Sequence, residues 1–199
     1  MSKAILMSIR PEHLINILSG NKTLELRKSV PKDYKGWVYI YCTKSKPYIR
    51  ELGDNYFTEC SKVDVYKLNG KVVVRFWFDE TYYIKQAVNV YGDELNQISI
   101  YDNKSYGWKA PKEQQEILKQ LCLTEQEVLD YGKGKILYTW NIKNLEIFDE
   151  PMELSDFYKA TLYATVQVIK EYEKRTNDFK SYRLQRPPQS WQYVWVEEV

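Results

Sequence analysis

Two periodicities alternate along this chain. Strands are predicted where apolar residues alternate with polar ones or form short continuous runs. These segments are 4–9, 22–28, 37–42, 71–78 and 190–196, with 81–85 as a continuation or a returning strand and 135–149 as one or two strands bent near Asn144. Helices are predicted where apolar residues recur every three or four positions, over 11–19, 111–121 and 125–131. Short helices mixed with many strands predict an α+β fold.

Local signals mark where the helices begin and end. Gly20 accepts the left-handed conformation that ends a helix. Thr124 and Glu127 have the spacing of a capping box, in which each side chain bonds the other residue's backbone. Ser155 is the predicted N-cap of the longest helix, over 157–178, whose apolar stripe favours core packing over a ligand site.

The chain shows no linker, repeat or low-complexity segment. Residues 1–199 are therefore predicted to form a single domain, a small barrel-like mixed sheet with helices on its rim. Two polar excursions, 45–69 and 85–111, interrupt the pattern of strands and helices. A long C-terminal helix and a final strand are expected to occupy 155–196.

Composition excludes several classes of protein. With 29 Lys and Arg against 27 Asp and Glu, the net charge of +2 excludes a uniformly basic coat but permits a local basic patch. One histidine, three widely spaced cysteines and no Gly-rich phosphate loop predict neither a metal site nor a bound cofactor. The 18 Tyr and 6 Trp fit either aromatic packing or stacking surfaces for bases, and composition alone favours packing.

The expected location is the cytoplasm. No apolar run approaches the ~18 residues that a membrane span requires, so no membrane partner is expected. The N-terminus turns polar too early for a signal peptide. An odd number of cysteines without a paired spacing fits a reducing compartment.

The most informative polar residues follow the first helix. In the predicted strand 22–28, Glu25 and Arg27 share the face opposite the leucines, and Lys22 precedes them. Arg offers a planar fork of donors and Glu accepts from an amino or imino N–H, so the three side chains could hold a phosphate or a base edge. The chemistry of the residues alone favours the alternative, a solvated strand face with a Glu25–Arg27 ion pair.

The run Gly20-Asn21-Lys22-Thr23-Leu24-Glu25-Leu26-Arg27 resembles the G-x-K-x-x-E-x-R signature of ASCH domains, which belong to the PUA-like superfamily. Further segments are similar to ASCH elements and to the distal part of phage-type members. These are SIRPEHLINIL (8–18), VYIYCTK (38–44), GKVVVRFWFDE (70–80), 123–134, 137–157 and RPPQSWQYV (186–194).

The resemblance implies a PUA-like β-barrel with a cleft that binds RNA, a nucleotide or a modified nucleobase. The ligand-binding residues implied for this chain are Ser8, Arg10, Lys22, Glu25, Arg27, Trp140 and Asn141. Trp140 could stack on a base. Asn141 stands where phage-type relatives often carry a histidine, so it can form hydrogen bonds but cannot titrate.

The resemblance also implies a hydrolase as an alternative. Some relatives are amidohydrolases on acetylated cytidine that use a Lys and a Thr three residues later, and others are credited with ribonuclease activity. Lys22 matches the Lys, but Glu25 occupies the Thr position, so an identical mechanism is not expected. A metal-independent hydrolysis would use Glu25 as general base, with Lys22 or Arg27 holding the developing negative charge.

Two other segments carry a functional interpretation. Basic side chains gather near the C-terminus, with Phe179 and Tyr182 between them, which suits single-stranded nucleic acid as well as it suits a solvated helix end. They are Lys174, Arg175, Lys180, Arg183 and Arg186. Alternatively, the chain is a phage accessory protein that binds a host protein through 45–69 and 85–111.

Overall fold

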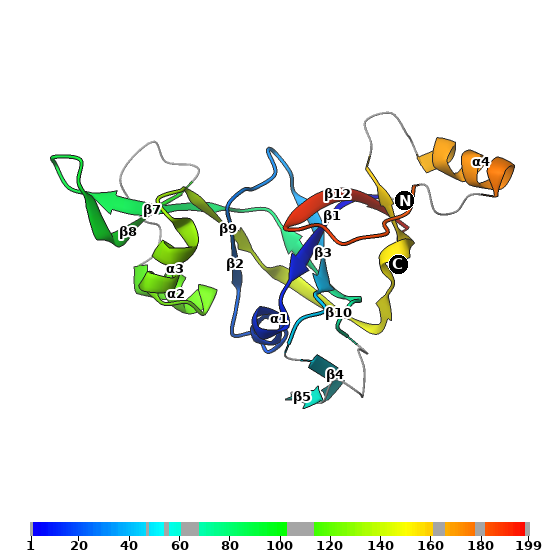
Figure 1. Ribbon diagram of the computed structural model, residues 1–199, viewed down its shortest axis with the longest axis horizontal. Helices are drawn as coiled ribbons and strands as arrows, with labels where there is room; N and C mark the ends of the chain where they lie inside the picture. The colour runs from blue at the N-terminus through cyan, green and yellow to red at the C-terminus, as the bar shows by residue number, and fades with distance from the viewer. Residues whose placement is uncertain are drawn as a thin grey trace. The chain divides into compact units, whose positions relative to one another are not determined.

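The computed structural model describes residues 2–46, 48–53, 56–60, 68–102, 114–160, 166–177 and 182–197 (Figure 1). Its contacts divide the chain into two compact units. Unit 1 comprises Met1–Ile15, Gly36–Phe76 and Leu145–Val199, and unit 2 comprises Asn16–Lys35 and Trp77–Asn144. The single-domain organisation stays a prediction.

Unit 1 is built on a six-stranded mixed sheet with the strand order β10-β6-β3-β1-β12-β11. Its strands are β1 (Ser2–Ile9), β3 (Gly36–Cys42), β6 (Val72–Phe78), β10 (Lys143–Met152), β11 (Phe157–Lys159) and β12 (Trp191–Val196). β1 runs parallel to β3 and antiparallel to β12, and residues 4–9 are all buried. A partner strand on each side explains why this segment is a continuous apolar run.

Unit 2 is built on a four-stranded antiparallel sheet with the order β2-β9-β7-β8. Its strands are β2 (Leu24–Arg27), β7 (Tyr82–Val88), β8 (Glu94–Asp102) and β9 (Leu137–Asn141), and its helices are α2 (Gln114–Leu121) and α3 (Glu125–Gly132). Leucine and isoleucine side chains of all four strands form one buried cluster with Ile117 and Leu121 of α2 and Val128 of α3. The two helices therefore cover one face of the sheet.

Most of the predicted helices and strands are confirmed. α1 (Pro11–Leu18) matches the predicted helix over 11–19, and β12 matches the predicted final strand. The Thr124–Glu127 capping box has both of its hydrogen bonds. The predicted bend near Asn144 coincides with a positive φ of 47° at that residue.

The prediction of a long C-terminal helix over 157–178 is wrong for its first residues. Ser155 lies in a 3-10 turn (Leu154–Asp156), and Phe157–Lys159 form β11, which pairs with β12. Phe157 is fully buried against the Tyr39 ring, at 5.2 Å between centroids. This packing outweighs the helical periodicity, and α4 runs only over Val166–Thr176. The described residues also form no closed barrel, so the predicted barrel is not found among them.

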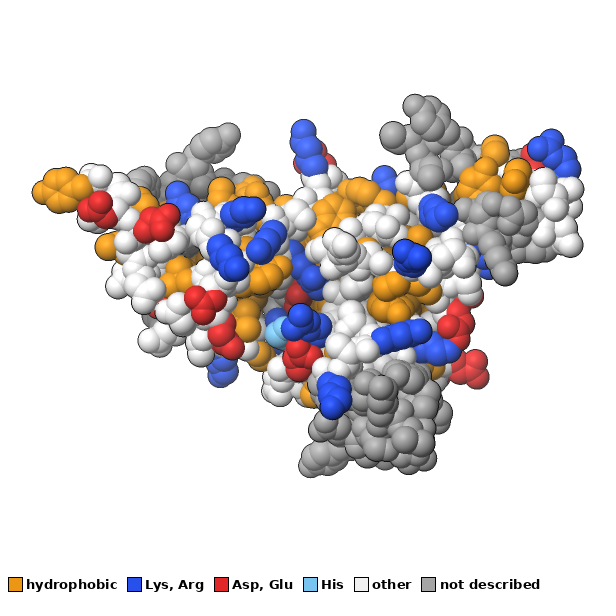
Figure 2. Space-filling view, viewed as in Figure 1, with side chains coloured by type: hydrophobic (Ala, Val, Ile, Leu, Met, Phe, Trp, Pro, Cys, Tyr) orange, Lys and Arg blue, Asp and Glu red, His pale blue; other side chains and the backbone are white. Residues whose placement is uncertain are grey.

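The first predicted excursion contains two strands that the periodicity did not show, and the second contains β8 and the end of β7, whose first residues match the strand predicted over 81–85. β4 (Tyr48–Gly53) and β5 (Tyr56–Cys60) pair within the first. In the second, β7 and β8 form a hairpin (Figure 1) with an apolar tip (Figure 2). Val90 and Tyr91, between the two strands, are exposed at 94% and 88%. Residues 103–113 lie outside the described part of the chain. A host-protein contact through these excursions stays a prediction.

None of the described helices combines the length and the apolar character that crossing a membrane would require.

Candidate functional site

The three residues of the ASCH-like motif come together in unit 2 as a chain of ion pairs. Lys22 Nζ lies 3.1 Å from Glu25 Oε2, and Arg27 Nε lies 3.1 Å from Glu25 Oε1. Alternation along β2 places Leu24 and Leu26 in the buried cluster and turns Glu25 and Arg27 to the other face. Lys22 Nζ also donates to the carbonyl of Leu121 at the end of α2, where a cation is favoured.

Burial separates the roles that these three side chains can play. The exposed fractions of the side chains are 2% for Lys22, 7% for Glu25 and 12% for Arg27. Lys22 and Glu25 therefore neutralise each other within the protein, and Arg27 is the member that reaches toward solvent. The interpretation of this segment as a solvated strand face is wrong.

Trp140 and Asn141 are placed where each contacts protein. Trp140 is fully buried, 4.6 Å from the Phe78 ring centroid, and its indole N–H donates to the Ser29 carbonyl. Its ring is therefore covered by protein, which leaves no face for the stacking role that the sequence predicted. Asn141 accepts hydrogen bonds from the backbone N–H groups of Asp79 and Glu80 and donates to the Asp79 carboxylate. It holds the turn between β6 and β7.

The Asp79 carboxylate in this turn is held in its ionised form. Burial raises its pKa, but hydrogen bonds from Lys143 and Asn141 outweigh burial, so the pKa lies below its ordinary value. A lowered carboxyl pKa contributes stability above about pH 4, and this contribution is lost as the pH falls through the lowered value. The turn beside β7 is thus fixed at neutral pH.

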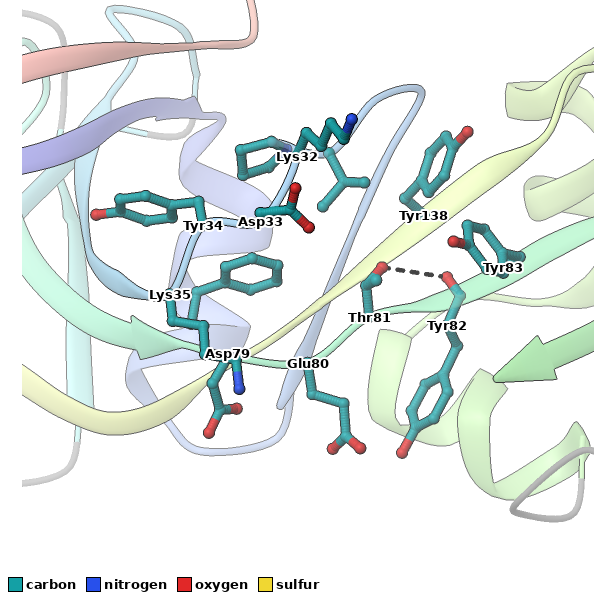
Figure 3. Close-up of a pocket in the computed structure, with 13 residues that line it drawn as sticks. Lys32, Asp33, Tyr34, Lys35, Asp79, Glu80, Thr81, Tyr82, Tyr83 and Tyr138 are labelled. Carbon is teal, nitrogen blue, oxygen red and sulfur yellow. Dashed lines mark hydrogen bonds between the residues drawn. The ribbon is translucent and has the colours of Figure 1, made fainter. Parts of the chain in front are cut away.

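A groove of about 810 Å³ lies beside this turn, within unit 2. One wall is the segment 30–35 after β2, and the other is formed by β7 and β9 (Figure 3). Lys32 and Asp33 lie on the first wall, and Tyr83 and Tyr138 lie on the second, while the Tyr82 ring points away from them. The groove therefore combines aromatic rings, a cation and a carboxylate.

Sequence reasoning missed this groove. The segment Val30-Pro31-Lys32-Asp33-Tyr34-Lys35 has no periodicity, and its polar residues resemble those of any loop. Asp33 has a positive φ of 52°, which marks a turn that Asp and Asn tolerate better than most residues. The available signal was the grouping of Lys32, Asp33 and Lys35 around Tyr34, shortly after the ASCH-like motif.

The two other predicted ligand residues lie in unit 1, whereas the motif lies in unit 2. Ser8 is buried, and its hydroxyl donates to the Pro188 carbonyl at 2.6 Å. Arg10 is exposed and lies 3.7 Å from the Glu12 carboxylate. Ser8 thus fixes the segment before β12, and Arg10 stays a surface cation.

The predicted basic stretch near the C-terminus is not one uniform surface. Lys174 and Arg175 are exposed at the end of α4, and Arg186 is exposed after it. Arg183 is held by the Glu173 carboxylate, the Ser155 carbonyl and the Tyr158 hydroxyl, so its guanidinium joins elements of unit 1. Lys180 lies outside the described residues.

No metal-binding cluster is found in the described part of the chain, and the Cys42 thiol is unreactive. No cluster of three or more His, Cys, Asp and Glu side chains there could hold a metal ion. Burial, reinforced by the Glu12 carboxylate, raises the pKa of the Cys42 thiol to about 12. The thiolate is the nucleophile, so Cys42 is unreactive in the folded protein.

The reactivity of the cysteine thiols tests whether Cys42 is buried and Cys122 is exposed. We expect iodoacetamide at pH 8 to label the exposed Cys122 readily and to leave Cys42 unlabelled until denaturant is added. Mass spectrometry of the peptides measures both positions. Equal labelling of Cys42 and Cys122 in the native protein would contradict the burial of β3.

No protein-family profile and no curated protein matches the chain. It is similar to the crystal structure of ASCH from Zymomonas mobilis, with 16% identity, 98% of this chain and 88% of that chain covered, and a TM-score of 0.49. A tyrosine-to-phenylalanine variant of that protein gives 16% identity, coverages of 99% and 92%, and a TM-score of 0.48. The structural neighbours are thus ASCH proteins.

Proposed function

We propose that the chain binds a nucleotide or nucleic acid through the groove of unit 2. The observation that supports this is the convergence of Tyr83 and Tyr138 with Lys32 and Asp33 around one volume of about 810 Å³. A nucleotide presents a flat aromatic base, base-edge donors and a phosphate. The groove offers a complementary group for each of them.

Each wall of the groove has its own task in this proposal. Tyr83 and Tyr138 stand at 73° to each other, so one ring stacks on the base and the other contacts its edge. Asp33 accepts a hydrogen bond from the amino or imino N–H of the base, and Lys32 holds the phosphate. Lys32 and Asp33 are both exposed, so they reach a ligand without breaking a buried contact. Figure 2 shows further Lys and Arg side chains over the region of β9 and α3, which suits an anionic ligand.

In this proposal the motif residues stabilise the groove without lining it. Arg27 lies opposite Tyr138 in the pairing of β2 with β9, and Glu25 fixes the position of its guanidinium. In this proposal Lys22 and Glu25 position Arg27 rather than contact the ligand. The proposal includes three further points. The chain is a member of the ASCH family, it is of the phage type, and its ligand is RNA or a component of RNA. A hydrolytic use of Glu25 and a cytoplasmic location stay predictions.

The test compares nucleosides with nucleoside monophosphates by isothermal titration calorimetry. Lys32→Ala is expected to weaken monophosphate binding by about tenfold, the order of one charge-assisted hydrogen bond, and to leave nucleoside binding unchanged. Asp33→Asn keeps the turn and is expected to remove the preference among bases. The matched control is Lys119→Ala, an exposed lysine of α2 that does not line the groove. If the parent protein binds neither nucleosides nor monophosphates, or if Lys32→Ala and Lys119→Ala behave alike, the proposal is wrong.

A further inference from the structure

We infer that the groove of unit 2 selects guanine nucleotides, because the Asp33 carboxylate lies where a base edge would meet it and matches a pair of donors that only guanine presents among the common bases. This inference rests on the proposed function and deepens it. It names the class of ligand that the groove takes and the residue that selects it.

Asp33 presents its carboxylate from a turn that is held in place. The segment 30–35 is anchored before Asp33 by the hydrogen bond from the Trp140 indole to the Ser29 carbonyl and by the buried Pro31. Asp33 itself takes the left-handed conformation, with a φ of 52°. Figure 3 shows its carboxylate pointing from this segment toward the wall formed by β7 and β9. The acceptor is therefore in position before a ligand binds.

Asp33 differs from the two other carboxylates that line the groove. Asp79 is held by hydrogen bonds from Lys143 and Asn141. In Figure 3 the side chains of Asp79 and Glu80 both point away from Asp33. The Asp33 carboxylate is exposed and forms neither a hydrogen bond nor an ion pair within the part of the chain that the structure describes. Asp33 is thus the carboxylate that a base in the groove can reach.

The chemistry of a carboxylate decides which base edge it accepts. Its two oxygens are both acceptors and lie side by side, so they pair best with two parallel N–H donors. Guanine presents such donors on one edge, the ring N1–H and the amino group on C2. Adenine and cytosine place a ring nitrogen acceptor beside their amino group, and uracil places a carbonyl on each side of its N3–H. With any of these three bases, one oxygen of Asp33 would face a lone pair.

The neighbouring cation leaves the carboxylate available for this pairing. Lys32 and Asp33 are adjacent and both exposed, yet they form no ion pair with each other. Figure 3 shows the Lys32 side chain extending away from the Asp33 carboxylate. The cation can therefore hold the phosphate while the carboxylate holds the base. A two-ring base also offers the stacking tyrosine a larger area than a pyrimidine does.

The experiment compares nucleoside monophosphates by isothermal titration calorimetry on the full chain. IMP keeps the N1–H and the carbonyl of guanine and lacks only the amino group. We expect IMP to bind about 10- to 100-fold more weakly than GMP, the range for one hydrogen bond to a charged acceptor. AMP, CMP and UMP keep the stacking and phosphate contacts, so they are expected to bind measurably but at least about tenfold more weakly than GMP.

Asp33→Asn is the variant that tests the pairing itself. Asparagine tolerates the left-handed conformation, so the turn is kept. Its amide presents one acceptor and one donor in place of two acceptors. Xanthine has a carbonyl where guanine has the amino group, so its N1–H and O2 match that amide. We expect the variant to bind XMP about tenfold more tightly than GMP, the reverse of the order in the parent protein.

The matched control is Asp130→Asn, at an exposed aspartate of α3 that does not line the groove, and it is expected to keep the preference of the parent protein. If the parent binds GMP, IMP and UMP equally, Asp33 is only a solvated turn residue, and the inference is overturned while the proposed function stands. An Asp33→Asn variant that still prefers GMP to XMP leads to the same conclusion. If none of the monophosphates binds to the parent, the proposed function fails and the inference fails with it.

Discussion

Replacing Glu25 with alanine is expected to lower the free energy of unfolding by about 3–5 kcal/mol, because it leaves two cations without their shared carboxylate. Lys22 and Arg27 both lie 3.1 Å from Glu25, and Lys22 is almost fully buried. Removing one partner of a buried pair costs far more than the pair contributes, since the remaining charge stays desolvated. Urea denaturation of parent and variant measures the loss.

Two further variants separate charge from packing. Glu25→Gln keeps the shape and removes the charge, so we expect nearly the same loss of stability as with alanine. Replacing Lys22 by Met together with Glu25 by Leu removes both buried charges and is expected to be less destabilising than Glu25→Ala alone. If Glu25→Gln restores the stability of the parent, packing rather than charge explains the cluster, and the interpretation given above is wrong.

The expected loss of stability affects the interpretation of binding measurements on Glu25 variants. If Glu25 were a ligand-binding residue on an accessible cleft, Glu25→Ala would abolish binding and leave the fold intact. Because Glu25 is buried between two cations, a loss of binding in this variant would report unfolding as well as ligand contact. Exposed groove residues such as Lys32 are the sharper probes, since their removal leaves no buried charge unpaired.

The sequence predicted those parts of the fold in which local signals and packing agree. β1 is an apolar run because it is buried on both sides, and α3 begins at Thr124 because the capping box satisfies its first N–H groups. Phe157 shows the opposite case. It has helical spacing, but pairing with β12 and contact with Tyr39 place it in a strand, and neither partner is near it in the sequence.

The candidate site also has a part that local sequence signals predict and a part that depends on contacts between residues far apart in the sequence. Glu25 and Arg27 are two residues apart, so strand periodicity was enough to place them on one face, and Lys22 lies only three residues before Glu25. The groove joins the segment 30–35 to Tyr83 and Tyr138, which are about 50 and 100 residues further along the chain. Their proximity depends on the pairing of β2 with β9 and of β9 with β7, which single-strand periodicity does not contain.

Trp140 gives the second large expected effect, and it links the fold to the groove. Trp140→Ala is expected to lower the free energy of unfolding by about 3–5 kcal/mol, because the fully buried indole leaves a cavity beside Phe78. The variant also removes the N–H donor of the Ser29 carbonyl, two residues before Pro31 in the wall of the groove. Thermal denaturation measures the first effect, and titration with UMP measures the second.

Trp140→Phe separates these two contributions. Phenylalanine keeps most of the apolar volume but cannot donate to Ser29, so we expect a smaller loss of stability and still a weakened affinity for UMP. The control is Trp191→Phe in unit 1, a partly buried tryptophan that packs on Tyr193 at 5.8 Å between ring centroids. A Trp140→Phe variant that binds UMP as the parent does would show that the Ser29 hydrogen bond does not position the wall. In that case the segment 30–35 is held by its own turn, in which Asp33 takes the left-handed conformation.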